Sequence, residues 1–280
     1  MKPTVCVVTG GSRGIGYAIS KRLFDDGYTV ILCSRKNGEA MRAANKIDSS
    51  GKRVFGIGAD VSIESDIKKL FAFVQKKFGR VDVLVNNAGV FWPFGPFEKC
   101  VFSENRKTIE INLLGTMLCS SYAVPLMKKR KWGRIINISG GGVGGDIPLS
   151  FATSYFTSKG GVAFFTEGLA VEVEKFGITV NAFLPGQILT EATRRLTKVS
   201  QKLLGSELIT AVKDLKKNGG SSTSDVADWV SFLISPKGDK ITGRLISVRW
   251  DKKESFKNRV SDERFKLRRI EGKIYKKVNK

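Results

Sequence analysis

Short apolar runs that alternate with longer segments of helical period constrain the fold of this sequence most strongly. Runs of this length, rich in Val and Ile, are typical of strands that are buried on both faces of a sheet. Parallel strands need helical crossovers between them, and the intervening segments are long enough to supply these. The predicted strands are residues 5–8, 30–33, 53–60, 81–85, 135–138 and 178–180.

The segment after Ser62 shows the helical period most clearly, because its apolar residues fall on one helix face and Gly79 follows as a C-cap. With 280 residues, the chain can also bury a large core. We therefore predict an α/β protein, a three-layer Rossmann fold whose doubly wound parallel β-sheet has about seven strands and helices on both faces. Residues 1–250 form the predicted Rossmann-fold domain, and residues 251–280 form a basic C-terminal extension.

The charge balance is strongly basic, with 48 Lys and Arg against 26 Asp and Glu and a formal net charge of +22. The extension alone holds 12 Lys and Arg against 5 Asp and Glu. Such a balance is compatible with nucleic acid, an anionic membrane, an acidic ligand or a solvated basic surface. Because the basic residues are dispersed and no known nucleic-acid motif occurs, we do not expect nucleic acid as a partner.

The composition also excludes several classes of site. The sequence contains no histidine, which excludes Ser-His-Asp and Cys-His mechanisms and every zinc site that uses histidine. Its four cysteines form no CxxC pair, so we expect free thiols and no metal site. No run approaches the roughly 20 apolar residues of a membrane helix, and the N-terminus lacks a secretory apolar segment. We expect a cytoplasmic protein that does not span a membrane.

A glycine-rich loop follows the first predicted strand directly, and a helical pattern opens within it. The loop reads Thr9-Gly-Gly-Ser-Arg-Gly-Ile-Gly16, with glycines spaced as Gly10-x-x-x-Gly14-x-Gly16. Glycines at such positions let the backbone turn tightly and approach a pyrophosphate, which then lies at the helix N-terminus. The placement of the loop in a βαβ unit predicts a dinucleotide site.

This spacing resembles the TGxxxGxG signature of the short-chain dehydrogenase/reductase family. Three further motifs agree in order and distance: residues 86–89 (Asn-Asn-Ala-Gly), Tyr155 with Lys159, and Pro185-Gly186 followed by Thr190. The resemblance covers roughly residues 4–250 and implies an NAD(P)-dependent oxidoreductase. The cofactor-binding residues that it implies are Gly10, Ser12, Arg13, Gly14, Ile15, Gly16, Ser34, Arg35, Asp60, Val61, Asn86, Ala88, Gly89, Tyr155, Lys159, Pro185, Gly186, Ile188 and Thr190.

The end of the second predicted strand indicates which cofactor is used. An NAD site usually places Asp or Glu there to bind the ribose 2′-hydroxyl, whereas this chain reads Cys33-Ser-Arg-Lys36. Arg35, together with Arg13 of the glycine loop, is suited to a 2′-phosphate through charge-assisted bonds. We therefore predict NADP(H), with NAD(H) the less favoured alternative.

Tyr155 and Lys159 are four residues apart and therefore share one face of a helix. We expect the Lys159 ammonium to lower the pKa of Tyr155, so that the phenol can act as general acid and base. The resemblance implies that Lys159 also holds the nicotinamide ribose and that Asn112 maintains a water relay to Lys159. The predicted activity is hydride transfer between NADP(H) and a small alcohol or carbonyl substrate.

The chain departs from the family at the catalytic serine. Where the family has a serine after Asn-Ile-Ser, this sequence continues Ser139-Gly-Gly-Gly142, so the serine position is Gly140 by motif or Gly142 by counting. Ser139 is the nearest hydroxyl and our predicted catalytic residue, although neighbouring strand residues face opposite sides. The alternatives are backbone N–H groups of the glycines, as in an oxyanion hole, or one of the hydroxyls of Ser150, Thr153 and Ser154.

Two segments are expected to line the substrate pocket above the carboxyl ends of the strands. Residues 91–97 are rich in aromatic side chains, which suits an apolar substrate but also simple packing or a subunit contact. Residues Arg194, Arg195, Lys198 and Lys202 suggest one basic helix face, which is either solvated or a site for an anionic substrate group.

The missing serine favours a second hypothesis, a non-catalytic Rossmann protein that senses NADP(H), against which the intact Tyr155 and Lys159 pair argues. We also expect a homo-oligomer, either a dimer or a tetramer. In the extension, Val260, Phe265, Leu267 and Ile270 lie among the charges, so we expect it to pack on the domain or on a neighbouring subunit.

Overall fold

A single parallel sheet organises the molecule in the computed structural model, which describes residues 4–140, 143, 150–186, 188, 204–205, 209–210, 213 and 220–256. Its seven strands lie in the order β3-β2-β1-β4-β5-β6-β7, and all neighbouring strands are parallel. The strand order reverses between β1 and β4, which is where such folds bind ligands. The strands are β1 (Val5–Thr9), β2 (Thr29–Ser34), β3 (Val54–Gly58), β4 (Val83–Asn86), β5 (Gly133–Ile138), β6 (Ile178–Leu184) and β7 (Arg244–Ser247).

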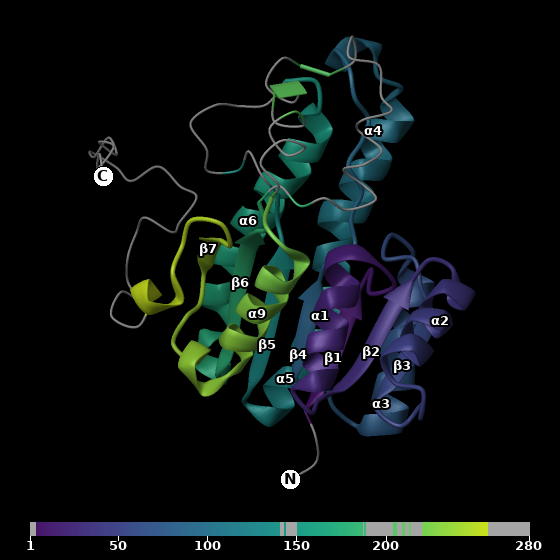
Figure 1. Ribbon diagram of the computed structural model, residues 1–280, viewed down its shortest axis with the longest axis vertical. Helices are drawn as coiled ribbons and strands as arrows, with labels where there is room; N and C mark the ends of the chain where they lie inside the picture. The colour runs from purple at the N-terminus through teal and green to yellow at the C-terminus, as the bar shows by residue number, and fades with distance from the viewer. Residues whose placement is uncertain are drawn as a thin grey trace.

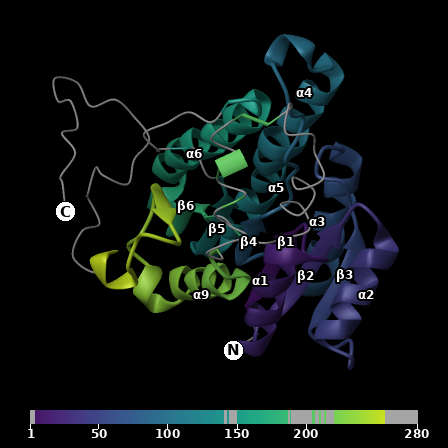
Figure 2. The same ribbon diagram turned by 45° about the horizontal axis from the view of Figure 1, so that its top comes forward.

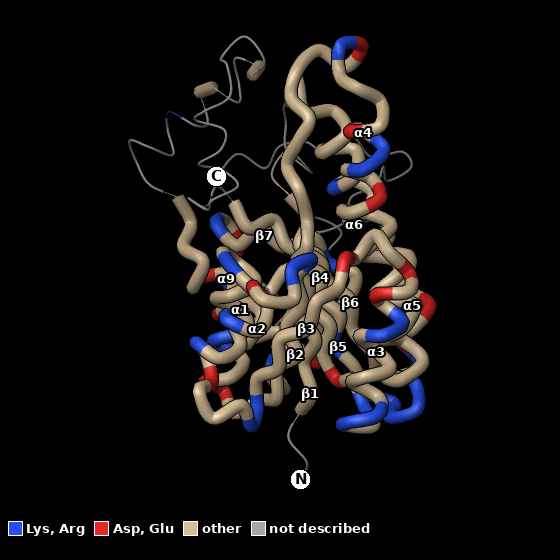
Figure 3. The backbone as a smooth tube through the Cα atoms, turned by 90° about the vertical axis from the view of Figure 1, so that its right-hand side faces the viewer, with Lys and Arg blue, Asp and Glu red and all other residues tan. Residues whose placement is uncertain are grey.

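Helices cover both faces of this sheet and form the outer two of three layers, as Figures 1 and 3 show. One layer contains α1 (Gly14–Asp25), α2 (Asn37–Ile47) and α9 (Thr223–Ile234), and the other contains α3 (Glu64–Phe78), α5 (Gly115–Arg130) and α6 (Thr153–Val173). Each layer encloses its own apolar core against the strands. Every fully buried Leu or Ile in these cores stabilises the fold by roughly 1.5–3 kcal/mol. The predicted fold class is confirmed.

Local signals in the sequence explain several boundaries. The helix predicted after Ser62 is α3, and it ends at Gly79, which adopts the left-handed conformation with φ of 72° and donates its N–H to Gln75. The predicted strands are present with ends shifted by a few residues, because pairing with neighbours extends or shortens a strand. Strand β7, which was not among the strands predicted by residue range, pairs with β6 at the edge of the sheet.

The long helical segment Phe102–Arg130 comprises α4 (Phe102–Ile109), a π-helical turn (Glu110–Leu114) and α5. Among the described residues it is the one helix long and apolar enough to cross a membrane by length and composition. In this fold α5 packs against β4, β5 and α3, and its Ser120 is buried. These contacts are those of a core helix in a sheet layer.

The carboxyl ends of the strands lie opposite the N-terminus, beside α4 and the first turns of α6 (Figure 1). Turning this end forward brings α4, α5 and α6 into view around it (Figure 2). The chain after β7 forms a short 3-10 helix, Lys253–Phe256, whose Lys253 ammonium lies 5.7 Å from the ring centroid of Trp229 in α9. The first residues of the predicted extension thus contact the domain, while residues 257–280 lie outside the described residues.

Candidate active site

The glycine loop between β1 and α1 has the conformation that close approach to a ligand requires. Gly10 and Gly14 have φ values of 62° and 56°, a region that side chains disfavour. A Cβ at Gly16 would overlap the carbonyl oxygen of Gly10, so the helix can begin this close to the loop only with glycine. No side chain caps α1 at Arg13, which leaves its first turn suited to a phosphate.

Two polar residues that the sequence analysis did not single out hold this loop against the end of β4. The Thr9 hydroxyl accepts the N–H groups of Asn87 and Ala88 at 3.0 Å each. The Asn87 amide donates to the carbonyl oxygens of Thr9 and Gly10 at 2.9 and 3.0 Å. The side chain of Asn86 points toward α5 instead, where it donates to Ser120 at 3.1 Å and to Asn137 of β5 at 2.9 Å. A cofactor contact at Asn86 would therefore use its backbone.

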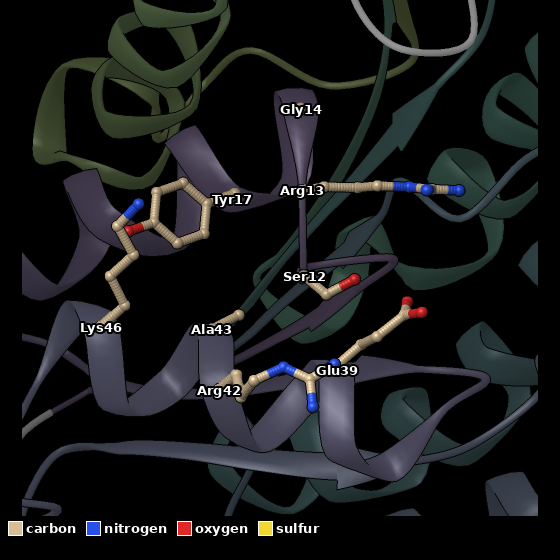
Figure 4. Close-up of a pocket in the computed structure, with 8 residues that line it drawn as sticks. All are labelled: Ser12, Arg13, Gly14, Tyr17, Glu39, Arg42, Ala43 and Lys46. Atoms are coloured by element: carbon tan, nitrogen blue, oxygen red, sulfur yellow. The ribbon is translucent and has the colours of Figure 1, made fainter.

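A cavity of about 440 Å³ lies between the glycine loop and α2. Its lining is predominantly cationic, because Arg13, Arg42 and Lys46 outnumber the single acid Glu39 (Figure 4). Arg35, which the sequence analysis assigned to the 2′-phosphate, is exposed at the end of β2 and is not among the residues that line this cavity. Arg42 was missed because only the packing of α2 beside α1 brings it near the loop. The lining residues are Ser12, Arg13, Gly14, Tyr17, Glu39, Arg42, Ala43 and Lys46.

The other predicted cofactor residues lie along the carboxyl ends of the strands. One Asp60 carboxylate oxygen accepts the N–H and hydroxyl of Ser62 at 2.9 and 2.7 Å, which closes the turn after β3. Val61 is buried against Gly115. Gly186, after Pro185, has φ of 77°, and Ile188 is buried. Thr190, like the predicted basic face at 194–202, lies outside the described residues.

Tyr155 and Lys159 project from the first two turns of α6 toward the end of β5. Lys159 is only 5% exposed, and its Nζ donates to the carbonyl oxygen of Ile138 at 2.8 Å. The same Nζ lies 5.9 Å from the ring centroid of Tyr155, so both side chains occupy one region. A Cβ at Gly89 would lie 3.4 Å from this Nζ, which places the end of the Asn-Asn-Ala-Gly motif directly beside the pair.

Burial controls the protonation of both groups. It lowers the pKa of Lys159 to about 8 and raises the pKa of Tyr155 to about 12. The expectation that Lys159 lowers the pKa of Tyr155 is therefore wrong for this structure. The physical reason is that burial removes the hydration that stabilises the phenolate. At neutral pH Tyr155 is a phenol, which is the form that can donate a proton.

The structure directs the Ser139 hydroxyl away from this pair. Ser139 is buried, and its Oγ donates to the carbonyl oxygen of Lys159 at 2.9 Å, so it anchors α6 to β5. We therefore correct our assignment of Ser139 as catalytic: the alternation of side chains along an extended backbone turns it into the protein. Gly140, in contrast, faces the pair, because a Cβ built there would lie 2.5 Å from the Tyr155 hydroxyl oxygen.

The other candidate hydroxyls are those of Ser150, Thr153 and Ser154. Ser154 is buried and donates to Asn105 at 2.7 Å, while Ser150 and Thr153 are exposed. Gly142, the serine position by counting, lies outside the described residues. Gly140, the serine position by motif, therefore faces the Tyr155 hydroxyl and brings no hydroxyl of its own.

Asn112 organises the site from the π-helical turn that precedes α5. Its side chain is fully buried, accepts the N–H of Val90 at 2.8 Å and donates to the carbonyl oxygen of Val90 at 3.0 Å. It also donates to the Ser158 hydroxyl at 2.9 Å, and Ser158 in turn donates to the carbonyl oxygen of Tyr155 at 2.6 Å. Asn112 thereby links the loop after β4 to the catalytic turn of α6.

The fold and this constellation agree with the comparisons to known proteins. Residues 4–201 match the family model described as short chain dehydrogenase. The chain therefore belongs to the short-chain dehydrogenase family of oxidoreductases.

Similar proteins include reductases from several bacteria. The 3-oxoacyl-(acyl-carrier-protein) reductase FabG of Staphylococcus aureus is 34% identical over 245 residues, which cover 86% of this chain and 95% of that protein. The short-chain reductase protein NovJ of Streptomyces niveus is 32% identical over 252 residues, which cover 88% of this chain and 92% of that protein. A crystal structure of an actinorhodin polyketide ketoreductase variant with NADPH superposes with a TM-score of 0.79 at 30% identity, covering 88% of this chain and 95% of the ketoreductase.

Proposed function

We propose that this protein is an NADP(H)-dependent oxidoreductase that interconverts a carbonyl compound and the corresponding alcohol. The observation that carries the proposal is the convergence of Tyr155 and Lys159 with Gly89 and Gly140 at the ends of β4 and β5. This cluster lies at the carboxyl edge of the sheet, to which the glycine loop also belongs. Such an arrangement supports proton transfer next to a bound dinucleotide.

The described residues fit NADP(H) at the positions that the chemistry requires. The uncapped first turn of α1 and the glycine loop suit the pyrophosphate, and the cationic cavity beside Arg13 and Arg42 suits a 2′-phosphate. The bound nicotinamide would supply the hydride acceptor or donor. The similar ketoreductase was crystallised with NADPH, which supports the same choice here.

Tyr155 performs the proton transfer in this proposal. In reduction its phenol, protonated because burial raises the pKa to about 12, donates its proton to the substrate's carbonyl oxygen. In oxidation the phenolate takes that proton from the alcohol. The Lys159 ammonium lies close enough to stabilise the phenolate while it exists.

Replacing Tyr155 by Phe tests the proposal. We expect Tyr155→Phe to reduce turnover of aldehydes and ketones with NADPH at least a hundredfold, because general acid catalysis typically contributes 10²–10⁴-fold. NADPH affinity, followed by nicotinamide fluorescence, should remain within about threefold, since the ring and its packing are retained. Substantial activity in this variant would show that the proton comes from another group.

The missing hydroxyl at Gly140 suggested a second candidate, a non-catalytic protein that senses NADP(H), but the similarity to reductases does not favour it. The same assay separates the two functions. A sensor would bind NADPH tightly and would consume none of it with any carbonyl compound, in the wild type as in Tyr155→Phe.

A further inference from the structure

We propose that Phe91, supported by Phe94 and Phe156, forms a subsite for an aromatic group bonded directly to the substrate's carbonyl carbon. The inference rests on the proposed function, because it assigns a substrate class to the same site. Of the three roles expected for the aromatic segment 91–97, which were substrate binding, packing and a subunit contact, we infer substrate binding for Phe91.

The aromatic rings form a continuous wall that includes the catalytic tyrosine. The ring centroid of Phe91 lies 4.2 Å from that of Tyr155, at an interplanar angle of 41°. Phe94 and Phe156 each meet Phe91 edge-on, with centroids 5.0 and 6.3 Å away. Phe156 also packs edge-on against Tyr155 at 5.2 Å. A substrate whose carbonyl oxygen reaches the Tyr155 hydroxyl therefore approaches this wall, in which Phe91 packs directly against the Tyr155 ring.

Hydrogen bonds from three different elements hold the loop that carries this wall. Asn112 binds both backbone groups of Val90, and the Thr108 hydroxyl of α4 donates to the carbonyl oxygen of Trp92 at 2.6 Å. Gly95 donates its N–H to the carbonyl oxygen of Phe151, just before α6, at 2.9 Å. A loop that is anchored on both sides of Phe91 presents a preformed surface, which lowers the entropic cost of binding.

The surface near Phe91 is apolar, and part of it stays open. Phe91, Phe94, Tyr155 and Phe156 all remain partly exposed although they contact one another. The cluster that contains Phe91 and Phe94 is completed, among the described residues, by the apolar side chains of Leu204 and Ile209. A charged substrate group placed against this wall would lose its hydration without a partner. The wall therefore selects for an apolar group.

Aromatic side chains also discriminate between flat and puckered rings of a substrate. Aromatic pairs are more favourable than their buried area alone predicts, by an amount that corresponds to roughly three- to tenfold in affinity or kcat/KM. An aryl ketone should exceed a saturated ketone of similar size by this factor. Acetophenone and cyclohexyl methyl ketone form such a pair, since they carry the same acetyl group on a flat or a puckered six-membered ring.

The experiment compares kcat/KM for these two ketones and for butan-2-one, with saturating NADPH, in wild type, Phe91→Leu and Phe97→Leu. Phe97 belongs to the same segment but is 53% exposed, which makes it the matched control. We expect wild type and Phe97→Leu to prefer acetophenone at least threefold. Phe91→Leu should lose the preference, because its kcat/KM for acetophenone falls further than its kcat/KM for cyclohexyl methyl ketone or butan-2-one.

Three outcomes overturn the subsite: equal kcat/KM for both ring ketones in wild type, a preference that survives in Phe91→Leu, or a fall in kcat/KM for butan-2-one in Phe91→Leu as large as that for acetophenone. The last would mean that Phe91 only positions Tyr155.

If wild type reduces no ketone, saturation-transfer NMR of acetophenone with the NADPH-loaded protein replaces the kinetic readout. Binding that Phe91→Leu abolishes and Phe97→Leu keeps would then support the subsite and refute the proposed activity. No binding, or binding unchanged in Phe91→Leu, would overturn the subsite.

Discussion

Gly140 faces the hydroxyl of Tyr155 with no side chain, at the position where the sequence motif predicts the family's serine. The residue lies at the end of β5, and the space that its Cβ would occupy is filled by the Tyr155 hydroxyl and the Lys159 stem, at 2.5 and 3.0 Å. The tyrosine hydroxyl thus stands closer to the strand than a serine at this position would allow. A side chain at this position would require the Tyr155 hydroxyl to shift.

We therefore predict that Gly140→Ser lowers kcat instead of restoring a missing group. The new Cβ would displace the Tyr155 hydroxyl, and misplacement of about 1 Å can cost as much as a hundredfold in rate. Steady-state kinetics of carbonyl reduction measure the effect. Gly168→Ala on α6, where a Cβ meets nothing within 4 Å, is the control and should retain full activity. Higher activity in Gly140→Ser would contradict this account.

Lys159 gives the reaction a predictable pH dependence. Burial lowers its pKa to about 8, while the pKa of Tyr155 is raised to about 12, so only Lys159 titrates near neutral pH. We expect kcat/KM for reduction to fall above about pH 8 through loss of one proton, because the neutral amine no longer stabilises the phenolate. A pH profile of wild type and Lys159→Arg tests this, since a guanidinium stays charged throughout the range. If kcat/KM falls above pH 8 in the same way in both proteins, the decrease results from titration of another group.

At the scale of elements, the packing of α2 beside α1 creates the cationic cavity next to the glycine loop. Arg42 and Lys46 lie on the side of α2 that faces this cavity, and Arg13 lies at the start of α1 (Figure 4). Glu39 partly offsets the positive charge of the cavity. Its carboxylate lies 3.6 Å from the Lys36 ammonium. The cavity therefore supports a preference for NADP(H) more strongly than the end of β2 does, because it brings several cations together beside the glycine loop.

We predict that wild type binds NADPH at least tenfold more tightly than NADH and that Arg42→Gln removes much of this preference. A charge-assisted bond to phosphate contributes about 1.5–3 kcal/mol, which corresponds to more than tenfold in affinity. Fluorescence titration with both cofactors measures the ratio. Lys52→Gln removes an equal charge from an exposed position outside the cavity and should leave the ratio unchanged. A ratio unaffected by Arg42→Gln would assign the 2′-phosphate to Arg13 and Arg35.

At the scale of the whole molecule, α5 and α6 expose apolar side chains on the outer side of their layer. Leu114, at the end of the π-helical turn, and Met117 of α5 are about half exposed, while Phe164 and Val171 of α6 are 65% and 78% exposed. The spacing of seven residues between Phe164 and Val171 places them on one helix face. Elsewhere basic and acidic residues are interspersed over the helices (Figure 3). An apolar surface among such charges is typical of a subunit contact.

We predict that a second copy of the chain packs on this surface and that Phe164→Glu shifts the protein to monomer. A buried carboxylate at the centre of an apolar contact is strongly unfavourable, which lowers association by at least tenfold. Sedimentation velocity across a concentration series measures the change. Met41→Glu, an exposed apolar position on α2 in the opposite layer, is the control. A wild type that sediments as a monomer at every concentration would refute the prediction.

The sequence alone was sufficient for features that act over short stretches of chain. The period of apolar residues predicted α3 and its Gly79 cap, and the runs of Val and Ile predicted most of the strands, because burial and turn geometry act locally. The spacing of Tyr155 and Lys159 likewise predicted that their side chains share one face of α6, since a helix turn repeats every 3.6 residues.

Only the tertiary structure decided features that depend on neighbours from distant parts of the chain. It turned the Ser139 hydroxyl toward Lys159 and left Gly140 facing Tyr155, because α6 packs over the end of β5. It reversed the expected direction of the Tyr155 pKa shift, because burial is a property of the surrounding fold. It also placed Phe91 against Tyr155, although 64 positions separate them in the chain. Local spacing determines which side chains share a face of a helix or loop, and tertiary packing determines which neighbours each side chain contacts.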